Sequence, residues 1–423
     1  MALSSGSPPS GVAVVRISGP EAAAVAAAFG AEGLSPRRAV LRALRAPSDG
    51  APVDSALCLS FPAPASATGE DVVEFHCHGS PAVVDRVLSE AVALKGVRMA
   101  EPGEFTLRAV LSGKMGLADA EALADLIAAR TEGERRRALR LSQGALSDRL
   151  ADWRQRLIGL LALCEAHIDF ADEGDVGGSA PDVDGGVSAL GREMATVLAQ
   201  SRDADKLTDG FRIVLVGPPN AGKSSLVNAL AGRRVALVSE EAGTTRDVVS
   251  VTLDLGGYRA IISDTAGVRE GTAGVEAMGI ARTREELGVA DFVVEVRSPD
   301  TQPLMRGDAD LVVAHKCDLG PIAGAGLATD IGDPSSIEAL AQRLTEATAT
   351  GLGGAENALV TRARQRSAMG DVLAALQEAG ATSHLELKAE ALRSGCHAMG
   401  RLTGEIGVED VLDDVFGRFC IGK

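Results

Sequence analysis

The sequence predicts an α/β and α protein: a mixed α+β domain first, then a helical domain interrupted by an inserted α/β domain with a doubly wound sheet. Three observations predict this order. Short apolar strands alternate with Gly/Pro turns up to about residue 112. A helical spacing of apolar residues runs from Leu117 to Phe170 and returns from about Asn357. Between them, a strand, a glycine-rich loop and a helix follow one another from Phe211. The predicted domains are residues 1–112, residues 113–209 together with 357–423, and residues 210–356.

The composition indicates a folded chain and excludes some classes of protein. The 423 residues are 46% hydrophobic, and the formal net charge of −16 argues against a protein that coats nucleic acid with most of its surface. No apolar run approaches the roughly 18 residues of a membrane span. The six cysteines are scattered and form no C-x-x-C pair, which predicts a reduced, cytoplasmic protein.

The first 112 residues contain the first candidate site. Strands are expected at residues 12–17 and 55–61 and a helix at residues 81–94. Residues 68–79 and 101–109 are unusually polar for their apolar surroundings, so both stretches are candidates for lining a site. In the first stretch, the side chains that alternate with apolar residues, and so share one strand face, are Glu74, His76 and His78. Two histidines at this spacing are only a weak metal signal, and polar residues that face substrate or solvent are the other interpretation.

The helical region carries a basic run. Residues 135–140 read Arg-Arg-Arg-Ala-Leu-Arg, and further arginines follow at positions 149, 154 and 156. Such a run is either a solvated helix face or a contact to nucleic acid, and the acidity of the rest of the chain keeps the second interpretation open. A Gly/Asp-rich loop is expected over residues 174–186, followed by a helix to about Lys206.

A phosphate-binding loop follows the expected strand at residues 211–216. Residues 217–224 read Gly-Pro-Pro-Asn-Ala-Gly-Lys-Ser. This spacing wraps backbone N–H groups around a polyphosphate, directs Lys223 at the outer phosphates and leaves the Ser224 hydroxyl for Mg²⁺. Further strands are expected at residues 249–255, 258–263, 291–297 and 310–315, so the nucleotide would bind at the strands' carboxyl ends.

Three more stretches indicate a guanine nucleotide. Asp264 ends a strand and can hold the Mg²⁺ shell, while the N–H of Gly267 can meet a γ-phosphate. Thr245 lies where a second Mg²⁺ hydroxyl is expected. Asp318 can accept two hydrogen bonds from guanine, and adenine offers no such donor pair. His315 stands where GTPases carry Asn, which predicts weakened but guanine-preferring binding.

The sequence gives a weaker indication of the group that activates water than of the phosphate ligands. Val268 stands where Ras-like enzymes carry the glutamine that orients water, and an apolar side chain cannot do so. Glu276 is the nearest plausible carboxylate. Asn220, within the phosphate loop, suggests a monovalent cation held by its amide and by loop carbonyls. Leu327-Ala328-Thr329 is expected to form the last base-contacting turn.

Assembled in this way, the chain resembles the MnmE (TrmE) family of tRNA modification GTPases over nearly its full length. The resemblance is carried by residues 15–20, 68–79, 101–108 and 168–170, the nucleotide motifs, and the terminal Phe-Cys-Ile-Gly-Lys of residues 419–423. It implies an N-terminal domain that dimerises and binds a formyl- or methylene-tetrahydrofolate, and a Ras-like GTPase domain activated by potassium and by dimerisation. It also implies an FAD-dependent partner, MnmG, with which an aminomethyl or carboxymethylaminomethyl group is installed at carbon 5 of the wobble uridine, U34, of certain tRNAs.

The resemblance also implies particular site residues. The folate ligands would be Arg16, Glu74, Lys114 and Lys423. The potassium ligands would be Asn220, Ser239, Glu241 and Thr244, and the Mg²⁺ ligands Ser224 and Thr245. Glu276 would orient the hydrolytic water through an intervening water, Lys223 would assist catalysis, and Cys420 is either a functional thiol or a buried structural one. The expected GTP contacts are Asn220, Ala221, Gly222, Lys223, Ser224, Ser225, Ser239, Glu240, Glu241, Ala242, Gly243, Thr244, Thr245, Asp264, Thr265, Ala266, Gly267, His315, Lys316, Cys317, Asp318, Leu327, Ala328 and Thr329.

Two other functions remain open at this point. One is a GTPase switch of the Era/Der kind that acts in ribosome assembly, although such a factor would be expected to carry an RNA-binding domain in place of the polar N-terminal stretches. The other is a folate-dependent aminomethyltransferase with a degenerate GTPase domain, against which the intact Lys223, Ser224 and Asp264 argue.

Overall fold

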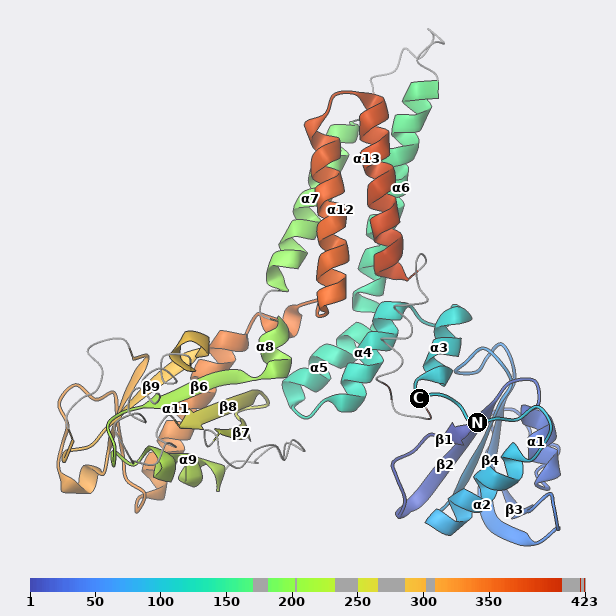
Figure 1. Cartoon of the computed structure of the whole chain (residues 1–423), viewed down its shortest axis with the longest axis horizontal. Coiled ribbons are helices and arrows are strands. Elements are labelled where there is room, and N and C mark those ends of the chain that lie inside the picture. Colours follow the sequence, from blue (N-terminus) through green and yellow to red (C-terminus); the bar gives the residue numbers. More distant parts are fainter. Residues whose placement is uncertain are drawn as a thin grey trace, which may run out of the picture. The chain divides into compact units, whose positions relative to one another are not determined.

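The computed structural model describes residues 1–169, 182–201, 204–232, 250–264, 286–301 and 309–404, together with Phe419 and Gly422. Its contacts divide the chain into two compact units, each of which is discontinuous in sequence. The first comprises residues 1–124, 142–162 and 389–423, and the second residues 125–141 and 163–388. Figure 1 labels the helices and strands of both units.

The first unit is built on a five-stranded antiparallel sheet with the order β1-β2-β5-β4-β3. Helices α1 (Ala22–Ala28) and α2 (Pro81–Val92) pack on one face of the sheet, where their apolar residues meet Val15, Phe75 and Cys58. The strands expected at residues 12–17 and 55–61 and the helix at 81–94 are confirmed. The strands are β1 (Ala2–Leu3), β2 (Ser10–Ser18), β3 (Val40–Arg45), β4 (Pro52–Phe61) and β5 (Val72–Gly79).

The polar alternation on β5 is also confirmed. Phe75 and Cys77 are buried in the core beneath the helices, whereas Glu74, His76 and His78 lie on the opposite face. An antiparallel sheet covered on one side shows this pattern, because successive side chains point to opposite faces.

Helices complete the first unit. Helix α3 (Glu104–Leu111) begins within the second polar stretch, and Phe419 packs against Leu117 and Ala120 at the start of α4. The helices α4 (Leu117–Ala128), α6 (Ser147–Asp169) and α13 (Leu385–Thr403) lie partly in this unit and partly in the second.

The second unit contains a six-stranded sheet with the order β11-β10-β9-β6-β8-β7, parallel except for β7. The chain runs from β6 outward to β8 and then returns to β9 on the other side of β6, which is the switch in direction of a doubly wound sheet. Helices α9 (Lys223–Ala231) and α11 (Pro334–Leu352) share its core. The expected strands are confirmed as β6 (Phe211–Val216), β7 (Ser250–Asp254), β8 (Arg259–Asp264), β9 (Phe292–Arg297) and β10 (Leu311–His315).

Two expectations in this unit are wrong. Leu327–Thr329 is a strand, β11, which pairs in parallel with β10 and therefore does not form a turn. The expected loop at 174–186 ends before Val183, where α7 (Val183–Gln200) begins, because the Asp182 side chain caps the helix by accepting a bond from the Gly185 N–H at 2.7 Å. The remaining helices are α5 (Glu132–Arg140), α8 (Ala204–Asp209) and α12 (Ala363–Ala381), with short turns η1 (Leu141–Ala145), η2 (Cys317–Leu319) and η3 (Ala355–Asn357).

None of the helices in the described part of the chain is long and apolar enough to cross a membrane.

Candidate nucleotide and cofactor sites

The phosphate loop between β6 and α9 is packed so closely that two of its positions require glycine. Gly217 has φ +153°, and a Cβ there would lie 2.3 Å from the carbonyl oxygen of Val296 on β9. Gly222 has φ +94°, and a Cβ there would lie 2.3 Å from Cδ2 of His315 on β10. These close approaches place the loop directly on the carboxyl ends of two neighbouring strands.

Backbone carbonyls of the phosphate loop hold the Lys223 side chain over the loop. Its ammonium group donates to the carbonyls of Gly217 and Pro218 at 2.8 and 3.0 Å, and burial lowers the pKa of this side chain. Lys223 is also the first residue of α9, so the amides at this helix end and the ammonium group converge on one region. A helix N-terminus with a lysine beside it favours an anion such as a phosphate.

Ser224 and Asp264 form the pair that the sequence predicted for Mg²⁺. The Ser224 hydroxyl donates to the carboxylate of Asp264, which is buried at the end of β8. The described residues contain no group of three His, Cys, Asp or Glu side chains that could hold a metal. A Mg²⁺ ion at this pair would need further oxygen ligands, and Mg²⁺ bound with nucleotides commonly takes some of them from phosphate and water.

His315 reaches the phosphate loop rather than solvent. Its side chain is buried, and Nδ1 lies 3.1 Å from the Thr329 hydroxyl, which itself donates to the Ala314 carbonyl. Nδ1 is therefore the nitrogen that donates, and burial lowers the pKa of the imidazole. The neutral ring fills the space beside Gly222.

Lys316 joins the next part of the site to the loop. Its ammonium group donates to the Asn220 carbonyl at 2.8 Å and to Asp300 at 3.2 Å. Asp318 follows in η2 with an exposed carboxylate, where a guanine base could reach it. Asp300 was missed by the sequence reasoning, although its position directly after β9 is the kind of place where such site residues occur.

A second polar site lies on the open face of the N-terminal sheet. Glu74 accepts bonds from Arg16 at 2.8 and 2.9 Å and contacts His76 Nε2 at 3.0 Å. The Arg16 guanidinium lies 5.5 Å from the centre of the Phe105 ring. His78 turns instead to Asp54, at 2.7 Å, so the two histidines do not converge on a common metal position.

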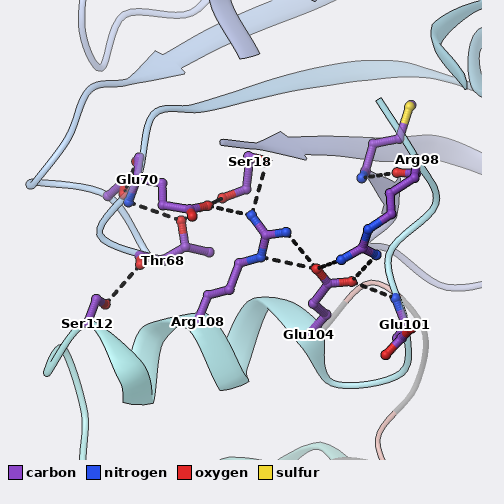
Figure 2. A network of polar contacts seen from close by, with 10 residues as sticks. Ser18, Thr68, Glu70, Arg98, Glu101, Glu104, Arg108 and Ser112 are labelled. Atoms are coloured by element: carbon purple, nitrogen blue, oxygen red, sulfur yellow. Dashed lines mark hydrogen bonds and ion pairs between the residues drawn. The ribbon is translucent and has the colours of Figure 1, made fainter. Parts of the chain in front are cut away.

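The two polar stretches of the N-terminal region come together in one network, which Figure 2 shows. Arg108 on α3 contacts Glu70 and Glu104, each at 2.6 Å, and Ser18 donates to the same Glu70 carboxylate at 2.8 Å. Arg98 donates to both oxygens of Glu104. Burial acts to raise the pKa of Glu104, but hydrogen bonds from Arg98, the Glu101 N–H and Arg108 outweigh it and lower the pKa to about 2.

The same network orders the surroundings of Lys114. The Ser112 hydroxyl donates to the Thr68 carbonyl at 2.9 Å, and Gly69 is so close to Ser112 that a Cβ would lie 2.7 Å from the hydroxyl oxygen. The Cε of Lys114 lies 3.6 Å from that same Cβ position, and the side chain is exposed. Near the end of the chain, Gly422 lies against the backbone of Leu3, on the strand that pairs with β2.

The basic run on α5 is used inside the molecule. Arg136 pairs with Glu356 at 2.8 Å, and Arg140 donates to the Glu356 carbonyl at 3.0 Å. Arg137 is buried and donates to the Ala204 carbonyl and the Thr208 hydroxyl. The fold therefore uses three arginines of the run, while the Arg135 and Arg136 side chains stay about half exposed, and the nucleic-acid contact stays a prediction.

Comparison with known proteins identifies the family. A family model described as the GTP-binding protein TrmE N-terminus matches residues 1–114, and one described as the MnmE helical domain matches residues 117–420. Proteins named tRNA modification GTPase MnmE are 46% identical in Methylobacterium radiotolerans, over 97% of this chain and 96% of the relative, and 47% identical in Azorhizobium caulinodans, over 100% and 98%.

The chain belongs to the MnmE family.

Two solved structures also match about a third of this MnmE family member. The G domain of the T. maritima FeoB iron transporter matches with 22% identity over 32% of this chain and 98% of that one, with a TM-score of 0.25. The corresponding G domain from Methanococcus jannaschii matches with 21% identity over 33% and 97%, with a TM-score of 0.24.

Several expected MnmE site residues lie outside the described residues. They are Ser239, Glu240, Glu241, Ala242, Gly243, Thr244, Thr245, Thr265, Ala266, Gly267, Glu276, Cys420 and Lys423.

Proposed function

We propose that the chain is the GTP-hydrolysing component of the complex that modifies carbon 5 of the wobble uridine in certain tRNAs. One observation carries this proposal: a member of the MnmE family combines two polar sites. The first is the phosphate loop with its Ser224–Asp264 pair, and the second is the site at Arg16 and Glu74. A ribosome-assembly switch would have no use for the second site.

In the nucleotide site, we assign Lys223 and the α9 amides to the β- and γ-phosphates and Ser224, with Thr245, to Mg²⁺. Asp264 would hold the metal's water shell. The exposed carboxylate of Asp318 would accept bonds from guanine, and the neutral His315 ring would support the loop. Glu276 would orient the attacking water, with Asn220, Ser239, Glu241 and Thr244 around a potassium ion that offsets developing negative charge.

In the N-terminal site, Arg16, Glu74, Lys114 and Lys423 would hold a formyl- or methylene-tetrahydrofolate, which supplies the one-carbon group. The Glu74 carboxylate can accept hydrogen bonds from a pterin, and the Arg16 guanidinium, which lies over the Phe105 ring, can attract a further aromatic ring. Lys114 is exposed and free to reach an acidic tail. Cys420 is assigned as a functional thiol.

We also propose a homodimer formed through the N-terminal sheet, acting in the cytoplasm with an FAD-dependent partner of the MnmG type. The open face of the sheet exposes Leu41 and Leu57, which are 62% and 44% exposed and directly paired on β3 and β4. Exposed apolar residues on a sheet face favour association. Light scattering on Leu57→Glu tests this, because loss of the dimer supports this face and a retained dimer contradicts it.

Hydrolysis of GTP and ATP in potassium and in sodium buffer is the experiment that tests the proposed function. GTP hydrolysis strongly favoured by potassium, with no use of ATP, is expected from Asp318 and the cation site at Asn220. Equal use of ATP, or no potassium effect, would contradict these assignments and favour the folate-dependent aminomethyltransferase alternative with a degenerate GTPase domain.

A further inference from the structure

The turn between β7 and β8 is bound by the N-terminal end of helix α5. The Gly133 N–H on α5 donates to the Gly257 carbonyl at 2.8 Å. A Cβ on Gly133 would lie 3.1 Å from that carbonyl oxygen and 3.1 Å from the Tyr258 ring. Gly257 would in turn bring a Cβ to 3.2 Å from Glu132. The two segments are thus in contact without spare room.

The turn itself is stiff. Gly256 and Gly257 both have positive φ, +67° and +88°, as a two-residue hairpin turn of type I′ requires. Asp254 accepts a bond from the Gly257 N–H at 2.7 Å. On the other side, a Cβ on Gly256 would lie 2.6 Å from Thr345 of α11. The turn is therefore wedged between two helices and cannot move along the strand direction without disturbing one of them.

Tyr258 fastens the turn to the same place as the α5 arginines. Its phenol lies near the carboxylate of Glu356, which also pairs with Arg136 at 2.8 Å. Burial, followed by the nearby Glu356 carboxylate, raises the pKa of the phenol. Arg140 donates to the backbone carbonyl of Glu356, so two arginines of α5 hold this residue, Arg136 at its carboxylate and Arg140 at its main chain.

The opposite end of the same hairpin carries the nucleotide site. Strand β8 begins at Arg259, next to the turn, and ends five residues later at Asp264, which accepts the Ser224 hydroxyl bond. At the usual rise per residue these ends are about 17 Å apart. Strand β8 is paired on both sides, with β7 from Ser250 to Asp254 and with β6 as far as Leu215. A paired strand of this length transmits displacement better than it absorbs it.

We propose that Gly133 and Tyr258 are positioning residues for GTP hydrolysis, and that the β7–β8 hairpin transmits the nucleotide state from Asp264 to helix α5. This inference rests on the assignment of Ser224 and Asp264 to the nucleotide site. It also assigns a role to the arginine run, because Arg136 and Arg140 hold Glu356, the residue beside Tyr258 at the turn of the hairpin. Coupling of this kind is reciprocal, so disturbing the α5 contact must alter the relative affinity for GTP and GDP.

The sole tyrosine of the chain provides a direct test. Full-length protein labelled with 3-fluorotyrosine has one ¹⁹F signal, from Tyr258. We expect its chemical shift to differ between the GDP complex and the complex with a non-hydrolysable GTP analogue, each at saturation in Mg²⁺ and potassium. The same signal in both complexes overturns the proposal while leaving GTP binding intact, and failure to bind either nucleotide overturns the proposed function as well.

The reciprocal test uses Gly133→Ala, whose methyl group would press on Gly257 and Tyr258. We expect the ratio of the dissociation constants for GDP and the GTP analogue to change by about threefold or more, the low end of usual coupling. A contact that only stabilises the fold would change both constants together or neither, and that result overturns the proposal. Gly191→Ala on α7 is the matched control, because a Cβ there meets no atom within 4 Å, and its ratio should equal that of the wild type.

Discussion

Replacing Glu104 by Gln should loosen the start of helix α3. The Glu104 carboxylate is 9% exposed and accepts bonds from Arg98, from Arg108 and from the Glu101 N–H. Gln keeps the shape of the side chain but removes the charge that the two arginines share. The substitution therefore isolates the electrostatic part of the network in Figure 2.

The size of the effect follows from the Glu104 pKa. The carboxyl has a reference pKa of 4.5 and a folded pKa of about 2. At about 1.4 kcal/mol for each tenfold change in proton affinity, the charged carboxylate stabilises this region by about 3 kcal/mol. Because the folded pKa is the lower one, this stabilisation is fully present above pH 4.5 and is lost as the pH falls from 4.5 towards 2. The local stability of this region should therefore be higher in the wild type than in Glu104→Gln by a constant amount from pH 7 to about 5. Below pH 5 the difference in stability should shrink as the pH falls.

Hydrogen exchange of the backbone amides in residues 104–111 is the assay, because it reports local stability in a chain of several cooperative units. A loss of about 3 kcal/mol corresponds to about a hundredfold loss of protection at pH 7. Glu101→Gln is the matched control, since it removes one exposed negative charge three residues away and should change protection less than about twofold. Equal effects of the two substitutions, or a margin that does not depend on pH below 4.5, would refute the reasoning.

Three further substitutions test the site assignments. His315→Asn should tighten GDP binding by about fivefold, because an added hydrogen bond is worth about 1 kcal/mol; titration with a fluorescent GDP measures it, and unchanged affinity would mean that the residue beside Gly222 does not matter to the nucleotide. Glu276→Ala should abolish GTP turnover while nucleotide binding persists, and normal turnover in a phosphate-release assay would remove the catalytic assignment. Arg137→Ala should lower the free energy of unfolding by about 2–3 kcal/mol, because it deletes buried hydrogen bonds to Ala204 and Thr208. Retention of tRNA on filters should stay the same in this variant, and a selective loss of tRNA binding would favour the nucleic-acid interpretation of α5.

Sequence reasoning succeeded where one local pattern determines the structure. The buried strand before the phosphate loop is a continuous apolar run, and β6 starts and ends where that run does. The alternation around Glu74 and His76 predicted which face of β5 is open. Successive side chains of a strand point to opposite faces, so Glu74 and His76 must lie on the open face once Phe75 is in the core. The nucleotide loop is recognisable because its chemistry requires fixed spacing. In contrast, β11 is three residues long and carries too little pattern to be distinguished from a turn.

Polar partners far apart in the sequence could not be predicted, and the arginines of α5 show why. A run of like charges in a sequence records how much charge a helix carries but not where the opposing carboxylates lie, and Glu356 is 220 residues from Arg136. In a chain with 58 acidic and 42 basic residues, a helix rich in arginine has many possible internal partners. Local composition therefore favours a solvated or nucleic-acid-binding surface, whereas the fold uses Arg136, Arg137 and Arg140 to hold η3 and α8. Variants of these three side chains therefore test the internal contacts to η3 and α8 together with any contact to tRNA, and only a loss of tRNA binding without a loss of stability would assign them to the second role.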